Sequence, residues 1–317
     1  MTQVWTLGEL LIDFVPDRSG VTLAQADRFI KAAGGAPANV AVGVSRLGVA
    51  SGFIGKVGDD PFGHWLAEVL RADDVDVRQL RFDTAARTAL AFVTLTAEGE
   101  REFMFYRHPS ADQLHRPGEI DDEAVASADI LHHGSISLIQ SPSREATLHA
   151  VEVARAAGRT ISYDPNLRPA LWPDDASARQ AILEAWPRAH LIKVSEDELA
   201  FLTGSREPAA ARELMHDDLR LLMVTRGAEG VAWFTRNDEG EEPGVRVEPV
   251  DTTGAGDAFM AAMLAACVRA PRLYEDREAL TEALRRANAY AALTTTRHGA
   301  IPGLPTREAL AGFVAAG

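Results

Sequence analysis

The sequence predicts one doubly wound α/β domain, a three-layer α/β/α sandwich that uses the whole chain, residues 1–317. From residue 128 onward, short apolar runs alternate regularly with helical stretches, which is typical of a sheet covered by helices on both faces. A glycine-rich corner, DTTGAGDAF at 251–259, leads into an apolar, glycine-free run, as expected where a ligand-binding loop opens a helix. A hydrophobic content of 46% and a charged content of 25% are ordinary for a globular protein.

In the N-terminal half, the apolar run at 4–15 predicts the first strand, and the small residues after the glycine pair at 34–35 predict a helix. A second strand at 50–58 and a second helix at 61–74 follow. Segment 88–107 is rich in strand formers, with AEGE at 97–100 as its hairpin turn. Because segments 13–30 and 88–108 do not fit the α/β alternation, we expect them to form a small inserted β lid.

The remaining elements follow the alternation of the C-terminal half. Expected strands lie at 128–135, 160–166, 190–195, 220–227, 231–235 and 245–250. Expected helices lie at 144–157, 176–186, 196–202, 258–268, 280–294 and 306–313.

Composition and missing motifs exclude several classes of function. The net charge of −14 repels polyanions, so we expect no nucleic-acid partner. No apolar run approaches ~20 residues and no basic leader precedes the first strand, which predicts a cytoplasmic protein without a membrane span. The single cysteine, Cys267, leaves no disulfide framework and no cysteine-based zinc site. The sequence contains no GxxxxGK[ST], GxSxG or HExxH motif, and Phe259 breaks the dinucleotide fingerprint.

The GAGD corner carries the most specific chemistry in the chain. Gly254 and Gly256 let the backbone approach a ligand closely, and the unpaired N–H groups of a helix start bind anions. Asp257 sits in the first turn, where a carboxylate is suited to take a proton from a hydroxyl that attacks the bound anion. The arrangement therefore indicates phosphoryl transfer to an alcohol.

With GGAPANVAVGVSRLG at 34–48 and DTTGAGDAF at 251–259, the chain resembles the ribokinase-like (PfkB) carbohydrate kinases nearly from end to end. The segments GSISLI, SYDPNLRPALW, KVSEDELAFLTG and TTTRHGAIPGLPT resemble fructokinases most. The resemblance implies an ATP-dependent kinase that converts D-fructose to fructose 6-phosphate. A 2-keto-3-deoxygluconate kinase, a riboside or nucleoside kinase, and a non-catalytic sugar-binding protein remain alternatives.

The resemblance also implies roles for individual residues. Asp257 matches the general base, and Gly254, Ala255 and Gly256 match the anion hole. The implied sugar-binding residues are Asp13, Gly34, Gly35 and Asn39, with Arg107 as a lid residue that would bind the carboxylate of a sugar acid. The implied ATP-binding residues are Arg168, Lys193, Thr225, Gly227, Gly230 and Asn288. Local sequence alone equally allows a turn role for Asp13, a helix cap for Asn39 and a surface ion pair for Arg168.

Two cations and a dimer complete what the resemblance implies. Many family members carry an NxxE motif near Mg²⁺, and here Ser195 replaces the asparagine while Glu198 keeps the carboxylate. Glu198 is therefore expected beside Mg²⁺ through water, although acidic residues in a first helical turn also favour the helix dipole. A K⁺ site is implied by the carbonyls of Asp251, Thr253, Thr294, Arg297, Gly299 and Gly303. The apolar lid residues predict a homodimer through the lids; they are Leu90, Phe92, Val93, Leu95, Phe103 and Phe105.

Overall fold

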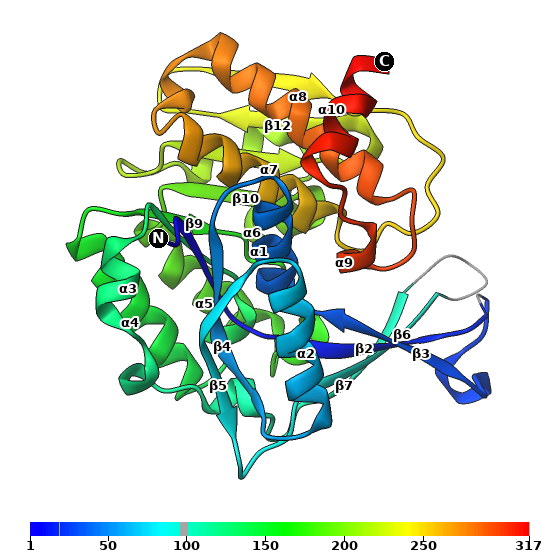
Figure 1. Ribbon diagram of the computed structural model, residues 1–317. Helices are drawn as coiled ribbons and strands as arrows, with labels where there is room; N and C mark the ends of the chain where they lie inside the picture. Colours follow the sequence, from blue (N-terminus) through cyan, green and yellow to red (C-terminus); the bar gives the residue numbers. More distant parts are fainter. Residues whose placement is uncertain (19, 96–100, 317) are drawn as a thin grey trace.

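The structure is a computed structural model that describes residues 1–18, 20–95 and 101–316. Its centre is a nine-stranded sheet in the order β13-β12-β11-β10-β9-β8-β1-β4-β5 (Figure 1). The pairs of β12 with β11 and with β13 are antiparallel, and the other pairs are parallel. The strands are β1 (Val4–Leu7), β4 (Ser51–Gly58), β5 (Asp76–Asp83), β8 (Ile130–His133), β9 (Thr160–Tyr163), β10 (Leu191–Ser195), β11 (Leu221–Thr225), β12 (Gly230–Phe234) and β13 (Glu239–Pro243).

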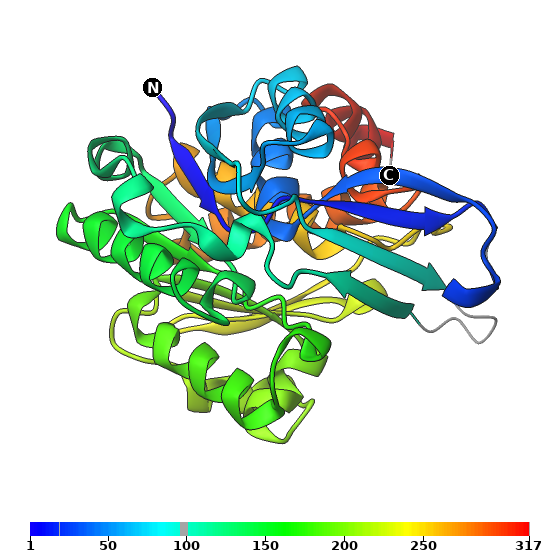
Figure 2. The same cartoon turned by 90° about the horizontal axis from the view of Figure 1, so that it is seen from below.

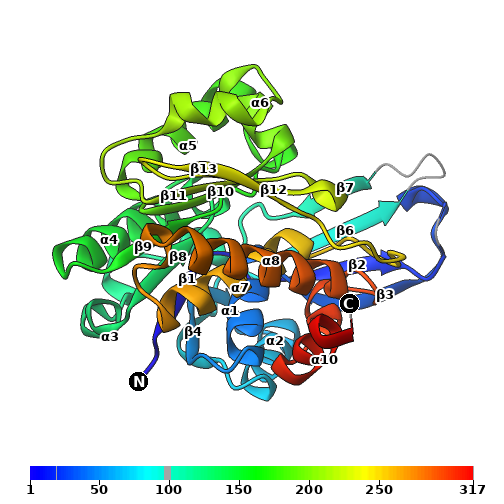
Figure 3. The same cartoon turned by 90° about the horizontal axis from the view of Figure 1, so that it is seen from above.

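Helices cover both faces of this sheet, which confirms the predicted three-layer architecture (Figure 3). Each face of the sheet has its own buried apolar cluster. This follows because successive side chains along a strand point to opposite faces of the sheet. One face carries α1 (Ala36–Arg46), α2 (Pro61–Ala72), α7 (Ala255–Arg269), α8 (Arg277–Thr294), α9 (Ala300–Gly303) and α10 (Arg307–Ala316). The other carries α3 (Asp122–Ser127), α4 (Ser143–Ala156), α5 (Asp175–Ala185) and α6 (Glu196–Thr203).

A second, four-stranded sheet projects from the body of the molecule (Figure 2). Its order is β3-β2-β6-β7, and it is built from β2 (Leu11–Pro16), β3 (Phe29–Gly34), β6 (Leu90–Leu95) and β7 (Arg101–Tyr106). The expected segments, 13–30 and 88–108, contain β6 and β7 and overlap β2 and β3, although β3 continues to Gly34. β6 and β7 pair antiparallel, as the hairpin prediction requires, and the AEGE turn itself lies outside the described residues.

The prediction of one strand at 4–15 is wrong, because this segment forms β1 in the large sheet and β2 in the small one. The chain changes direction at Gly8, which has a φ of +155°; a Cβ there would lie 2.6 Å from the Pro37 side chain. Only glycine fits this position. Because apolar residues such as Leu7 and Leu10 lie on either side of it, the hydrophobic pattern looks like that of one continuous strand. Strand β5 was not among the predicted elements.

The strand expected at 245–250 is also wrong, because the sheet ends at β13 and these residues run beyond it without regular structure. Pro249 has no N–H to donate to a neighbouring strand. Instead, the N–H groups of Val250 and Asp251 donate to the Thr295 carbonyl, at 2.8 and 3.0 Å. The segment is therefore fixed to the end of α8, and the GAGD corner follows a loop.

The strand order reverses between β1 and β8, since β4 and β5 extend to one side and β8 to β11 to the other. In open α/β sheets ligands bind beyond the carboxyl ends of the strands at such a point. The residues that follow β1, β8, β9 and β10 therefore surround the expected site. Within the described part of the chain, no helix combines the length and the apolar character needed to cross a membrane.

Candidate active site

The GAGD corner forms the start of α7, as the sequence predicts. Gly254 is the N-cap residue with a φ of +79°, and a Cβ there would lie 2.7 Å from the Ala300 side chain. Glycine is required on both counts. The next residues, Ala255 and Gly256, open the helix with N–H groups that lack intrahelical acceptors, and Asp257 follows in the first turn.

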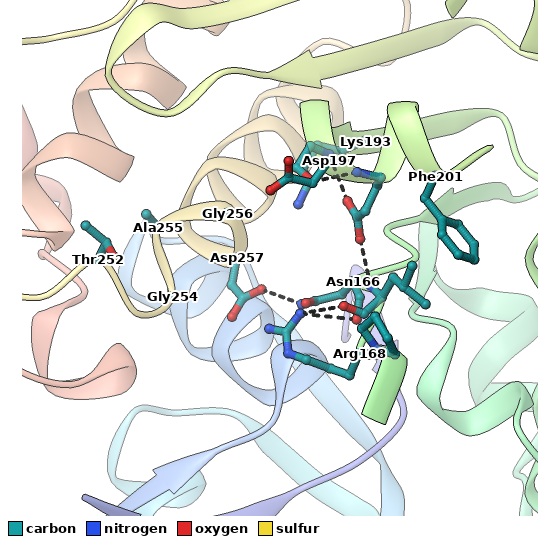
Figure 4. Close-up of a pocket in the computed structure, with 14 residues that line it drawn as sticks. Asn166, Arg168, Lys193, Asp197, Phe201, Thr252, Gly254, Ala255, Gly256 and Asp257 are labelled. Atoms are coloured by element: carbon teal, nitrogen blue, oxygen red, sulfur yellow. Dashed lines mark hydrogen bonds between the residues drawn. The ribbon is translucent and has the colours of Figure 1, made fainter. Parts of the chain in front are cut away.

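Asp257 is buried, and an amide donates to each of its carboxylate oxygens; Figure 4 shows the bond from Asn166. Asn39 Nδ2, from α1, lies 2.8 Å from Oδ2, and Asn166 Nδ2, from the loop after β9, lies 3.2 Å from Oδ1. Burial raises the pKa of Asp257, while the Asn39 hydrogen bond and the nearby Lys193 and Arg168 cations oppose the rise. The carboxylate is therefore oriented and more basic than an ordinary aspartate.

Two cavities meet at this carboxylate. One, of about 490 Å³, runs along the start of α7 toward β10 and α6. The other, of about 120 Å³, lies beneath the small sheet. Four residues line both: Asn166, Arg168, Gly254 and Asp257. A proton acceptor in a wall shared by two cavities can serve a reaction between their two occupants.

The cavity beneath the small sheet contains most of the predicted sugar residues. Asp13, Gly35 and Asn39 line it. Gly34 lies behind Asp13, where a Cβ would be 2.1 Å from Asp13 Oδ2. Burial raises the pKa of Asp13 to about 7, with smaller contributions from Arg168, which lowers it, and from Asp257 and Asp251, which raise it. The buried Asn39 Oδ1 has no hydrogen-bond partner among the described residues, so it is available to a ligand hydroxyl.

Arg107 is not among the residues that line either cavity. It is buried, and its guanidinium pairs with Asp112. Glu9, which no sequence motif singles out, does line the smaller cavity. Glu9 Oε1 accepts the Ala36 N–H at 3.1 Å and so caps α1, whose N-cap residue Gly35 has no side chain to do so. Burial raises the pKa of Glu9 to about 7.

Lys193 and Asp164 form a buried ion pair in the larger cavity. Lys193 Nζ donates to Asp164 Oδ2 at 2.8 Å, and a Cβ on Gly256 would lie 3.1 Å from the same ammonium. Burial alone would lower the pKa of Lys193, but the Asp164 and Glu198 carboxylates raise it above its ordinary value. A cation therefore lies directly beside the helix start. The sequence predicted Lys193 but missed Asp164 and Asn166, although both belong to the DPN run that carried the resemblance.

Glu198 has a structural role that the sequence did not show. Its oxygens accept the N–H groups of Leu167, at 2.6 Å, and Ser195, at 2.8 Å, and Ser195 Oγ accepts the Glu198 N–H at 3.2 Å. This reciprocal capping box begins α6. Serine and asparagine are both strong N-cap residues, which explains how Ser195 replaces the asparagine of the NxxE motif without loss of the helix start.

The other predicted nucleotide residues, Thr225, Gly227, Gly230 and Asn288, are not among the residues that line the larger cavity. Thr225 pairs in register with Ser195, which does line it. Gly227 follows with a φ of +54°. Gly230 has a φ of +102°, and a Cβ there would lie 2.1 Å from the Glu242 carbonyl oxygen. The fold alone therefore requires glycine at this position, with or without a nucleotide contact. Asn288 is buried and donates to the carbonyls of Glu242 and Pro243.

The six residues of the implied K⁺ site lie in two segments, 251–253 and 294–303, and Asp251 forms hydrogen bonds to both. Its carboxylate accepts the N–H groups of Thr253, at 2.9 Å, and Gly299, at 2.8 Å. A Cβ on Gly303 would lie 2.8 Å from the Thr294 carbonyl oxygen and 3.7 Å from that of Arg297. Two of the six carbonyl oxygens, those of Thr294 and Arg297, therefore lie close to Gly303.

Comparison with known proteins agrees with this geometry. Residues 1–307 match the model of the pfkB family carbohydrate kinases. The chain is 52% identical over 313 residues to probable fructokinase-7 of Arabidopsis thaliana, covering 98% of this chain and 91% of that protein. A fructokinase from Xylella fastidiosa with bound ATP superimposes with a TM-score of 0.91 at 35% identity, covering 100% of this chain and 99% of that one. A fructokinase double mutant from Vibrio cholerae O395, with fructose, ADP and a potassium ion bound, gives a TM-score of 0.86 at 35% identity, covering 99% and 98%.

The chain therefore belongs to the pfkB family of carbohydrate kinases. It is an ATP-dependent sugar kinase, and the plant and bacterial proteins compared above, which it matches across nearly its full length, are named as fructokinases.

Proposed function

We propose that this protein transfers the γ-phosphoryl group of ATP to the primary hydroxyl of D-fructose, giving fructose 6-phosphate and ADP. The observation that carries the proposal is the place of Asp257, in the wall shared by the two cavities. The smaller cavity, lined by Asp13 and Asn39, takes the sugar, and the larger one takes the triphosphate. The names of the relatives, fructokinases of plants and bacteria, favour fructose as the sugar.

In this scheme Asp257 accepts the proton of the attacking hydroxyl as the oxygen–phosphorus bond forms. The N–H groups at the start of α7, from Gly254 to Gly256, stabilise the negative charge on the transferring group. The buried Lys193 ammonium, beside Gly256, adds a positive charge to the same place. Arg168 lines both cavities and is suited to hold phosphate oxygens. Thr225, Gly227, Gly230 and Asn288 extend the nucleotide site toward the ribose and the adenine.

The proposal includes Mg²⁺ and K⁺. No group of three or more His, Cys, Asp or Glu side chains in the described residues could hold a metal ion. Mg²⁺ keeps several waters and binds mainly to substrate phosphates, so a single carboxylate fits it. Each Glu198 oxygen accepts one N–H and retains a lone pair for such a water. For K⁺ the proposal relies on backbone carbonyls: those of Thr294 and Arg297 lie close to Gly303, and Asp251 links the two segments through its hydrogen bonds to Thr253 and Gly299.

The small sheet is proposed to act as the lid over the sugar. Val93 and Phe105, from β6 and β7, line the roof of the smaller cavity. Val15 and Ile30 pair in register on the same face, with 43% and 63% of their surface exposed. A second copy of the lid packed on this face would cover them and close the sugar site, which supports the homodimer. The side chains of Leu95 and Phe103 lie outside the described residues, and a cytoplasmic location stays a prediction.

The charge of the smaller cavity favours a neutral sugar over 2-keto-3-deoxygluconate. Its lining includes one arginine, Arg168, and four acidic side chains: Glu9, Asp13, Asp251 and Asp257. Arg107, the residue expected to bind a substrate carboxylate, is paired with Asp112 and lines neither cavity. A carboxylate would therefore be repelled where a hydroxyl would find acceptors.

The test is a side-by-side comparison of kcat/KM for fructose, 2-keto-3-deoxygluconate, ribose and a purine riboside with ATP as donor. Fructose should lead by at least about tenfold, which corresponds to one good hydrogen bond. Preference for the sugar acid would overturn the substrate assignment and leave the chemistry of Asp257 intact. Absence of turnover with all four substrates would overturn both.

A further inference from the structure

Asn166 is one of two described non-glycine residues with a positive φ, at +47°; the other is Asp74, at +56°. Asparagine adopts this left-handed conformation more readily than most residues. The chain is fixed on both sides of it. The Pro165 carbonyl accepts the Ser135 N–H at 3.0 Å, and the Leu167 N–H donates to Glu198 at 2.6 Å. The surrounding loops therefore impose the conformation, as is common where a backbone has a functional role.

This backbone conformation places the Asn166 amide beside the base. Its Nδ2 lies 3.2 Å from Asp257 Oδ1 (Figure 4), while Asn39 Nδ2, from the other side, lies 2.8 Å from Oδ2. One amide comes from α1 and the other from the loop after β9, so the carboxylate is held between the two halves of the chain. Each oxygen accepts one amide N–H and keeps a lone pair for the sugar hydroxyl.

A glycine would meet the backbone requirement at this position at less cost, since glycine populates positive φ freely. The side chain is therefore retained for a contact, and the hydrogen bond to Asp257 is the contact that the structure shows. The loop itself is already tethered through Pro165 and Leu167. Unlike Asn39, Asn166 was not expected from the family's motifs.

We propose that Asn166 is a positioning residue, which holds the Asp257 carboxylate in the plane that faces the sugar hydroxyl and keeps it ionised. The inference rests on the proposed role of Asp257 as the general base. A donor to the ionised form of a carboxylate stabilises that form and offsets part of the effect of burial. The charged groups that face Asp257 from the surrounding elements are Lys193, Arg168, Glu198, Asp13 and Asp164.

The first variant for the test is Asn166→Gly, which keeps the backbone conformation and removes only the amide. We expect kcat to fall about 10- to 100-fold, as for loss of a hydrogen bond to a charged group, with little change in the KM for ATP or fructose. As a matched control, Asp74→Gly makes the same backbone change at a site outside both cavities and should leave kcat unchanged. Thermal unfolding and ATP binding report whether each variant is folded.

The second variant, Asn166→Asp, has the same size and tolerates the same φ, but it places a carboxylate against Asp257. We expect the acidic limb of its kcat–pH profile to move to higher pH, because a neighbouring negative charge disfavours ionisation of the base. In Asn166→Gly the same limb should also move to higher pH, because the donor that stabilises the ionised carboxylate is lost, whereas a purely structural role for Asn166 would leave the profile of the glycine variant in place.

Wild-type kcat in a folded Asn166→Gly variant, or an unshifted profile in Asn166→Asp, would overturn the proposal. If wild-type protein does not phosphorylate fructose at all, the proposed function fails instead, so the two failures are distinguishable. If the glycine variant does not fold, the profile of the aspartate variant decides.

Discussion

Four acidic side chains line a cavity of about 120 Å³, and burial raises the pKa of three of them. The pKa of Glu9 and of Asp13 rises to about 7, and that of Asp257 rises as well. Removal of these carboxyl groups from water leaves their ionised forms poorly stabilised, even where an amide or a backbone N–H donates to them. At the scale of single residues, the site is therefore expected to lower the stability of the fold.

The first prediction concerns the pH dependence of stability at Asp13. Its pKa is about 7 in the folded chain against 3.8 for an ordinary aspartate, so the folded state binds more protons between these values. The contribution of Asp13 to the free energy of unfolding consequently falls as pH rises from about 4 to 7. Asp13→Asn should be more stable than wild type at pH 8, by an amount on the order of 1 kcal/mol, and nearly equal at pH 4.

Chemical denaturation of wild type and Asp13→Asn at both pH values measures this difference in the free energy of unfolding. Steady-state kinetics of the same variant test whether Asp13 also binds the sugar. The KM for fructose should rise strongly while the KM for ATP changes little. A variant that is less stable than wild type at pH 8 would show instead that Asp13 supports the fold.

The second prediction distinguishes the effect of the Lys193 charge on turnover from its effect, as a buried ion-pair partner, on stability. Lys193→Met should lower kcat by about 100-fold or more, because a charge placed beside the transferring group acts mainly in the transition state. Lys56 offers a matched control, since it is also buried in a strand and pairs with Asp83 and Glu119, each at 2.9 Å. Lys56→Met should lower the melting temperature, as breaking a buried ion pair does, and leave the kcat of folded protein unchanged. Equal effects of both variants on kcat would assign Lys193 to the fold alone.

At the scale of elements, the start of α7 combines a helix that the sequence predicts well with a packing constraint that it does not show. Residues 258–268 are apolar and free of glycine, and the structure extends this helix to Ala255–Arg269. Gly256 has ordinary helical geometry, so its lack of a side chain is explained by the Lys193 ammonium, 3.1 Å from where a Cβ would lie.

The third prediction follows from this contact. Gly256→Ala should keep α7 intact but displace the ammonium by a few tenths of an ångström, with a fall in kcat of roughly tenfold, as misplacement in an active site can cause. Gly312→Ala in α10 is the control, because nothing lies within 4 Å of its added Cβ. That change should raise the free energy of unfolding by up to about 1 kcal/mol without affecting kcat. If Gly256→Ala has wild-type kcat, the position of Lys193 is not important for turnover.

Sequence periodicity predicted most helices and parallel strands correctly but failed where apolar runs change sheets or leave them. Residues 4–15 look like one strand, although a single glycine, Gly8, sends them into two sheets. Residues 245–250 alternate like a strand, but they pair with no strand, and the N–H groups of Val250 and Asp251 at their end donate to the Thr295 carbonyl after α8. In the site, motif residues such as Asp13, Asn39 and Asp257 could be predicted. Glu9, Asp164 and Asn166 could not, because their roles depend on tertiary contacts between segments far apart in the chain.

At the scale of the whole molecule, the small sheet exposes apolar side chains on the face that covers the smaller cavity. Val15 and Ile30, paired on the cavity face, are 43% and 63% exposed. An exposed apolar sheet face of this kind is usually buried against another surface, and we propose that the lid of a second copy of the chain buries it.

The fourth prediction is that light scattering gives twice the chain mass of 34.2 kDa at micromolar concentration. The double variant Val15→Glu, Ile30→Glu should give a monomer, because it buries two charges in the proposed interface. Leu183→Glu, at a comparably exposed apolar residue of α5, should remain dimeric. A monomeric wild-type protein would contradict the lid-to-lid dimer.

The central claim, that Asp257 takes the proton of the sugar hydroxyl, is tested most directly by single-turnover phosphorylation of fructose by Asp257→Asn with saturating ATP. The substitution keeps the size of the side chain and removes its basicity. The rate of phosphoryl transfer should fall by roughly 10²- to 10⁴-fold while the Kd for ATP stays near that of wild type. A transfer rate within a few-fold of wild type, in a variant that still binds ATP and fructose, would contradict the mechanism.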